Sequence, residues 1–191
     1  MTAQSIETAV PATATGAYDI DPSHSNLGFV ARHAMVTKVR GNFSDISGSL
    51  TLDVANPAAS SAEVTVEVAS VDTRNAQRDE HLRTNDFFDA AQFPQLTFKS
   101  TAVTQTGATS FDVTGDLTIR GVTKPVTVSW DYTGSATDPF GNERVGFEGS
   151  ATINRADFGL KYNAPLAAGG VLISEKIVLE LEVSAIKREA K

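Results

Sequence analysis

One stretch, from Asp72 to Pro94, constrains the fold most, because the chain on both sides of it alternates apolar and polar residues with a period of two. Inside the stretch, apolar side chains are scarce as far as Leu82 and then gather at Phe87, Phe88 and Phe93. Such a polar beginning favours a helix over a strand. A chain of strands with a single helical insert is compatible with few architectures.

On both sides of this insert, the alternation marks eight candidate strands. Each strand has one apolar and one polar face, which is typical of antiparallel strands that face water on one side only. The candidate strands cover residues 26–33, 46–54, 63–68, 96–102, 111–119, 126–132, 145–153 and 177–185.

Eight strands are enough to close a barrel that holds side chains or one small ligand. Closure also removes the exposed edges that long strands otherwise leave. The sequence therefore predicts an all-β fold, an eight-stranded antiparallel barrel with one helical insert between strands 3 and 4. The helix is expected to be capped by Asp72 or Thr73 and to end near Asn85. A two-sheet sandwich is the alternative that fits the same strand count.

The length and charge of the chain narrow its class. A chain of 191 residues suits one domain. Residues 1–16, rich in Ala and Thr, are predicted to be a flexible tail, and residues 17–191 the barrel domain. The net charge of -7 argues against nucleic acid as a partner, because binding phosphates requires clustered Lys and Arg. The absence of Cys excludes disulfides and thiolate metal sites.

The N-terminal segment does not have the pattern of a secretory signal, because it contains no Lys or Arg before Arg32 and no continuous apolar run. No segment approaches the ~20 apolar residues that cross a bilayer as a helix, so no transmembrane segment is expected. The expected location is the cytoplasm.

Small residues recur on the predicted inner faces of the strands. In one interpretation they ease strand bending and the interior packs solidly. In the other they leave apolar volume that a ligand fills, since an unfilled core is unfavourable. The sequence leaves both interpretations open for Ala31, Gly48, Ser100, Ala102, Gly115, Gly149, Ala151 and Ala185.

Three blocks of sequence resemble one known family. They are YDIDPSHSNLGFVARHAMVTKVRGNF (18–43), HLRTNDFFDAAQFPQLTFKS (81–100), and DLTIRGVTKPVTV (116–128) with INRADFGLKYN (153–163). In this order, and from about Tyr18 to Lys187, the chain resembles the YceI-like family of lipocalin-like, polyisoprenoid-binding proteins. Many members of that family carry a secretory signal.

The resemblance implies a lipocalin-like barrel with an apolar tunnel for an isoprenoid lipid, either a polyisoprenoid or an isoprenoid quinone, and no other cofactor. With the strand alternation, it predicts ten ligand-contacting residues on the inner faces: Leu27, Phe29, His33, Phe98, Phe111, Leu117, Trp130, Phe147, Leu179 and Leu181. Candidates for a polar tunnel mouth are His24, Ser25, His33, Arg83, Asp86, Arg155 and Asp157. Phe87 and Phe88 are expected to close the tunnel.

The polar candidates also have plainer interpretations. An Arg suits a pyrophosphate head group because it makes paired charged hydrogen bonds. However, Arg83 and Asp86 have the i,i+3 spacing of a surface pair. Arg155 and Asp157 are equally placed to pin the loop after strand 145–153.

The function predicted from these observations is non-catalytic binding, storage or transport of a long-chain isoprenoid lipid. The alternative is an isomerase or hydrolase that uses the inward His33 and a carboxylate inside the barrel. A catalytic zinc is not expected, because the chain has no His-Glu-x-x-His motif. The predicted partner is the lipid, and a homodimer is left open.

Overall fold

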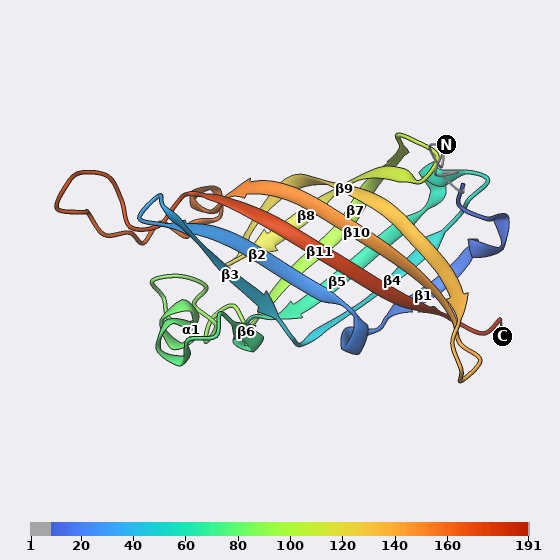
Figure 1. Cartoon of the computed structure of the whole chain (residues 1–191), viewed down its shortest axis with the longest axis horizontal. Coiled ribbons are helices and arrows are strands. Elements are labelled where there is room, and N and C mark those ends of the chain that lie inside the picture. The colour runs from blue at the N-terminus through green and yellow to red at the C-terminus, as the bar shows by residue number, and fades with distance from the viewer. Residues whose placement is uncertain (1–8, 191) are drawn as a thin grey trace, which may run out of the picture.

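The computed structural model describes residues 9–190, and its strands form one closed, antiparallel sheet (Figure 1). The sheet closes because β11 pairs with both β1 and β2, through Tyr18 with Lys187 and Leu27 with Leu181. The strands are β1 (Gly16–Ile20), β2 (Asn26–His33), β3 (Thr37–Phe43), β4 (Ile46–Leu52), β5 (Ser61–Glu67), β6 (Val71–Asp72), β7 (Gln95–Gln105), β8 (Ser110–Ile119), β9 (Val122–Thr137), β10 (Glu143–Asn154) and β11 (Lys176–Lys187).

The eleven strands make an eight-stranded barrel, because three positions in the ring are each occupied by two consecutive pieces of chain. β1 and β2 share the first position, and both pair with β11. β3 and β4 share the second position, where β3 pairs with β2 and β4 pairs with β1. β5 and β6 share the third position, where β5 pairs with β4 and β6 pairs with β3. The remaining five strands pair with their neighbours in sequence. The predicted eight-stranded antiparallel barrel is confirmed, and the two-sheet sandwich is wrong.

Three strand pieces were not predicted, namely β1, β3 and the two-residue β6. β1 is only five residues long and ends at Ile20, and after Asp21 the chain enters the short 3-10 helix η2 (Pro22–His24). Proline has no N–H for a sheet ladder, so the first strand of the barrel breaks there. β3 carries exposed Lys38 and Arg40 and lacks a clear apolar face. The predicted first and second strands correspond to β2 and β4 and begin at the observed residues, but the pieces that precede them, β1 and β3, were missed.

The predicted helix lies in the insert between β6 and β7, but its bounds differ. Helix α1 (Ala76–Arg83) is capped by Asn75, whose side chain accepts a hydrogen bond from the Arg78 N–H at 2.9 Å. Thr73 does not cap the helix, because its N–H and hydroxyl both donate to the buried carboxylate of Asp79. The helix starts later and ends earlier than predicted.

The part of the predicted tail that the structure describes is packed against the barrel, and residues 1–8 lie outside the described residues. Ala14 is buried, and its carbonyl accepts a hydrogen bond from the Tyr18 hydroxyl at 2.8 Å. The short 3-10 helices besides η2 are η1 (Ala12–Ala14), η3 (Pro57–Ala59), η4 (Val68–Ser70) and η5 (Arg155–Phe158).

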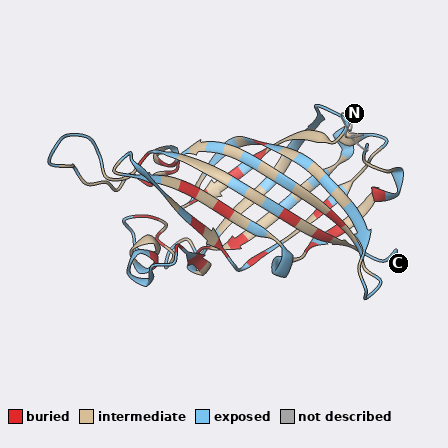
Figure 2. Cartoon of the chain, in the orientation of Figure 1, coloured by how far each residue is buried: buried red, intermediate tan, exposed pale blue. Residues whose placement is uncertain are grey.

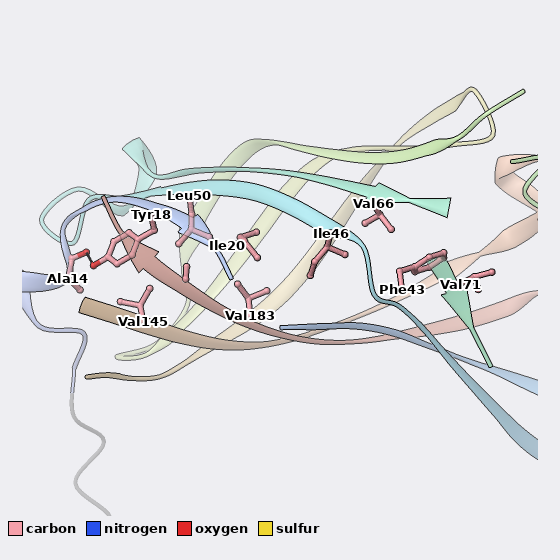
Figure 3. Close-up of a cluster of buried hydrophobic side chains, with 11 residues drawn as sticks. Ala14, Tyr18, Ile20, Phe43, Ile46, Leu50, Val66, Val71, Val145 and Val183 are labelled. Atoms are coloured by element: carbon pink, nitrogen blue, oxygen red, sulfur yellow. Dashed lines mark hydrogen bonds between the residues drawn. The ribbon is translucent and has the colours of Figure 1, made fainter. Parts of the chain in front are cut away.

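Buried hydrophobic residues form two clusters. Figure 2 shows the buried residues along the chain in red. The larger cluster includes Tyr18 of β1, Val145 of β10 and Val183 of β11, and runs along the barrel to Val71 (Figure 3). The second cluster comprises Leu117, Ile119, Phe158 and Leu160. Between the clusters, many inward apolar residues are only half-buried.

A charged network fixes the corner where the first strand breaks. Arg144 of β10 donates to Asp21 at 2.7 Å and to Asp138 at 2.8 Å. The pKa of Asp21 lies well below its usual range, because its carboxylate accepts hydrogen bonds from Ser23, which contributes most, and from Arg144. The pKa of Asp138 is also lowered, because its carboxylate accepts hydrogen bonds from Asn142, which contributes most, and from Arg144.

We predict that Arg144→Gln reduces the acid sensitivity of the fold. Carboxylates with a lowered pKa in the folded state stabilise it fully above about pH 4, and this stabilisation is lost as the pH falls further. The free energy of unfolding by urea should therefore drop less in R144Q than in the wild type between about pH 5 and pH 2. Arg188→Gln, which breaks the more exposed pair with Asp19, is the comparison and should reduce the acid sensitivity less than R144Q does, because solvent screens that pair. An equal drop in R144Q and wild type would contradict the prediction.

Candidate ligand-binding site

The barrel encloses an apolar cavity of about 520 Å³. Side chains from all eight strand positions line it, and nearly all of them are hydrocarbon. Phe29, Phe98, Trp130 and Leu179 point into the barrel and yet are only half-buried, because part of each side chain borders the cavity. The interior is therefore not solidly packed, but of the eight small residues predicted to face inward only Ala31 lines the cavity. Ala102 is exposed, because the pairing of β7 with β8 shifts register between Ser100 and Ala102.

Glycines keep the centre of the barrel open by allowing large rings to lie against the wall. A Cβ atom built on any of three inward or wall glycines would fall 2.4–2.5 Å from an aromatic ring carbon. A side chain at these positions would push the ring toward the lumen, since such contacts are far inside van der Waals distance. The pairs are Phe29 over Gly41, Phe98 over Gly115, and Trp130 over Gly149.

One end of the cavity is closed by the insert, and we call it the insert end. Phe87 and Phe88 both line the cavity here, so the rings that were expected to close the tunnel also form its wall. Phe87 is buried and stacks against Tyr162 at 5.2 Å between ring centroids. Its backbone carbonyl accepts a hydrogen bond from Arg120 of the β8–β9 turn at 3.0 Å. The insert is therefore tied to two other connections of the barrel.

Arg155 is buried at the insert end and lines the cavity. Its guanidinium donates to the backbone carbonyls of Leu160 (2.7 Å), Ser174 (2.9 Å) and Ile173 (3.3 Å). Burial lowers the pKa of this guanidinium, which nevertheless stays charged. The described residues place no carboxylate within ion-pair distance of it, and Asp157 is exposed. Arg155 thus pins the loop after β10, without Asp157.

The other polar candidates lie outside the cavity. Arg83 does not pair with Asp86: it contacts Glu80 at 3.3 Å and donates to the carbonyl of Ala69 at 3.0 Å, while Asp86 pairs with His81 at 2.8 Å. His33 is exposed at the end of β2, so the prediction that it points inward is wrong. Neither His24, which contacts Asp21 at 2.8 Å, nor Ser25, which bonds to the Ser184 carbonyl, lines the cavity.

The sequence predicted the apolar residues of the cavity wall more accurately than the polar residues. Nine of the ten predicted inner-face residues line the cavity, His33 being the exception, and so does Arg155. The nine are Leu27, Phe29, Phe98, Phe111, Leu117, Trp130, Phe147, Leu179 and Leu181. Whether these residues contact a ligand remains a prediction.

The opposite end of the cavity is the open one, and we call it the tail end. It is lined by the β4–β5 loop, the β7–β8 hairpin and residues 9–10. Several of its lining residues, such as Ala9, Gln105 and Ala108, are exposed, whereas Arg155, Phe87 and Phe158 at the insert end are buried. The polar groups Asp53, Ser60, Ser61 and Gln105 lie at this end. None of these four residues was predicted from the sequence.

The geometry does not assemble the site required by the enzymatic alternative. None of the three histidines lines the cavity, and Asp53 is the only carboxylate among the described residues that does. In residues 9–190, no cluster of three or more His, Asp or Glu side chains could hold a metal ion. The helices of this same part of the chain are all too short or too polar to cross a membrane.

Comparisons with known proteins agree with this architecture. The model of the YceI-like domain family matches residues 18–185. A UPF0312 protein of Pseudomonas aeruginosa is 41% identical over 170 residues, covering 89% of this chain and 85% of the relative. The crystal structure of BcnA from Burkholderia cenocepacia has a TM-score of 0.76 and 26% identity, and covers 86% of this chain and 98% of that one. A polyisoprenoid binding domain from Saccharophagus degradans has a TM-score of 0.68 and 17% identity, and covers 90% and 98%.

We predict that Gly149→Ala destabilises the fold by about 1–3 kcal/mol, because the added methyl group collides with the Trp130 ring. Urea unfolding measures the loss. The double substitution with Trp130→Leu should recover part of it, since the smaller side chain removes the collision. Gly107→Ala, where the nearest atom is 3.4 Å from the added carbon, is the control and should change stability little. Failure of the double variant to recover stability would contradict this account of the wall.

We also predict that Arg155→Leu destabilises the protein by about 2–4 kcal/mol, because three carbonyls lose their donor at a buried site. Arg83→Leu, which removes a less buried guanidinium, should have a smaller effect. The comparison is made by urea unfolding at pH 7, and equal losses in the two variants would contradict the assignment of Arg155 as the pin of this loop.

Proposed function

Given that this chain belongs to the YceI-like domain family, we propose that it binds a long-chain isoprenoid lipid, of the polyprenyl or quinone type, inside its barrel without catalysis. The observation that carries the proposal is the 520 Å³ cavity whose wall is almost entirely apolar. A cavity of this size lies in the range of small-molecule binding sites.

The chemistry of the wall supports an extended hydrocarbon as the ligand. Between Arg155 at the insert end and the polar residues at the tail end, the cavity presents aliphatic and aromatic side chains only. A polar ligand would lose its hydrogen bonds to water along this path without gaining others. A hydrocarbon chain covers the half-exposed rings of Phe29, Phe98 and Trp130 and gains from leaving water.

Burial of the chain provides retention and little selectivity. About 40 carbons at ~0.8 kcal/mol per methylene correspond to roughly 30 kcal/mol of gross transfer from water. Measured affinities saturate near 18–21 kcal/mol, and such a lipid leaves a membrane or micelle rather than water. Selection among lipids therefore depends on the length of the cavity and on the polar groups at its ends.

The polar groups at the tail end favour a neutral head group there. The Ser60 hydroxyl accepts a hydrogen bond from the Asp53 N–H at 2.9 Å and keeps its own proton to donate. Gln105 donates to the Gly107 carbonyl at 3.0 Å and leaves its own oxygen as an acceptor. The carboxylate of Asp53 would repel a pyrophosphate at this position. A quinone or alcohol head group therefore fits the open end better than a phosphorylated one.

The fold shared with the polyisoprenoid binding domain of Saccharophagus degradans is compatible with this proposal, although at 17% identity the likeness concerns the fold alone. Storage and transport both follow from reversible retention of a lipid in a closed barrel.

Obstructing the cavity tests the proposal. We predict that Leu179→Trp, which adds a large ring to the wall, lowers the amount of lipid that co-purifies with the protein by at least about tenfold, a loss of ~1.4 kcal/mol or more in affinity. The lipid is measured by native mass spectrometry and organic extraction. The control is Glu180→Trp, which places the same ring on the outer face of the same strand and should leave the lipid content unchanged. Recovery of no isoprenoid lipid from the wild type would contradict the proposal.

A further inference from the structure

Two connections at the insert end protrude side by side from the barrel (Figure 1). One is the β2–β3 turn and the other is the loop between η5 and β11. The Ala34 N–H donates to the Leu172 carbonyl at 2.7 Å, and His33 forms a β-bridge with Ile173. We define the apolar tip as residues 34–36 together with residues 164–172.

The apolar tip exposes large hydrophobic side chains to solvent. Met35 is 60% exposed, Val36 73% and Val171 40%. They are three of the four large hydrophobic residues that the described part of the chain exposes, and the fourth, Phe140, lies in the β9–β10 hairpin at the other end of the barrel. Contiguous exposed apolar groups mark an interaction surface.

The turn in the apolar tip is not built from residues that favour its conformation. Ala34 and Met35 have φ values of 50° and 60°, in the left-handed region. Asn and Gly adopt this region more easily than Ala or Met. Neither the backbone conformation nor the exposure explains a Met here, so contact with an apolar surface is a better explanation.

The loop of the apolar tip is internally bonded. Asn163 accepts hydrogen bonds from the N–H groups of Ala164 (3.0 Å) and Ile173 (2.9 Å) and donates to the Ile173 carbonyl at 2.7 Å. The bridge of Pro165 with Val171 closes the outer part of the loop. Internal bonding of this kind suits a loop that enters a less polar medium, where free backbone groups are unfavourable.

Basic residues surround the apolar tip. Residues 32–40 and 160–173 contain Arg32, Lys38, Arg40 and Lys161 and no Asp or Glu, a local charge of +4 in a chain of net charge -7. Arg40 pairs with Glu180 at 3.7 Å, whereas the other three form no ion pair within residues 9–190.

Three carboxylates lie near the base of the loop, and one of them, Asp86, pairs with His81, whose ring lies 4.9 Å from that of Tyr162. Asp157 belongs to η5, and Glu175 contacts Asn154 of β10 at 3.4 Å. Asp157 precedes the loop and Glu175 is its last residue, so the apolar tip itself contains no carboxylate.

We propose that the apolar tip docks on the surface of a bilayer that contains anionic lipids. Met35, Val36 and Val171 enter the boundary between head groups and acyl chains, and Arg32, Lys38 and Lys161 face the lipid phosphates. Apolar insertion combined with basic residues is the general pattern of reversible membrane attachment. The proposal concerns attachment only and is independent of what the cavity holds.

The test is co-sedimentation of the full chain with vesicles of phosphatidylcholine and phosphatidylglycerol (7:3) that contain no isoprenoid, compared with phosphatidylcholine alone. We expect binding to the anionic vesicles that declines with salt. Met35→Asp with Val171→Asp should abolish it, whereas Phe140→Asp should not. Lys38→Gln and Lys161→Gln should each weaken binding about fivefold, corresponding to the ~1 kcal/mol of a basic residue near an anionic surface.

Three results would overturn the proposal. One is absence of wild-type binding to the anionic vesicles, and another is an equal loss in the Phe140→Asp variant. The third is a tip that mediates contact between two copies of the chain, seen as a dimer by light scattering that dissociates in the tip variants. Because the vesicles lack isoprenoid, failure here leaves the lipid content of the L179W experiment unaffected, and the two proposals fail separately.

Discussion

The pairing of β11 with both β1 and β2 is the constraint on which the rest of the structure depends. It closes the sheet into a ring, and it gives every strand an inner face. The inner faces cannot all meet across a ring of eight strands unless large side chains fill the middle. In this chain the large side chains lie along the wall, and the closed sheet therefore surrounds a space.

The sequence was most informative where one physical rule applied over a long distance. Period-two alternation located nine wall residues, because a strand side chain faces either the lumen or the solvent. It failed at His33, which continues the inward series of β2 but lies beyond the end of the barrel. Alternation reports the face of a strand and does not report where the barrel stops.

Polar contacts were harder to predict, because they depend on which loops meet. Arg83 and Asp86 have the spacing of a helical pair, yet α1 ends at Arg83 and the two side chains find other partners. Arg155 is separated from the carbonyls of Ile173 and Ser174 by a whole loop, so no local pattern could indicate that they bond. The polar residues of the tail end escaped notice for the same reason.

The three glycines that lie beneath Phe29, Phe98 and Trp130 have a consequence for how the space inside this barrel could change. Each pair acts on a different stretch of the wall, from β2–β3, β7–β8 and β9–β10. Exchanging a single glycine for a larger residue swings one ring inward and narrows the bore at one depth only. The length and thickness of the space inside the barrel can thus change in independent steps, each requiring one codon, although at Gly115 the added carbon would also lie 2.6 Å from the backbone carbonyl of Lys99.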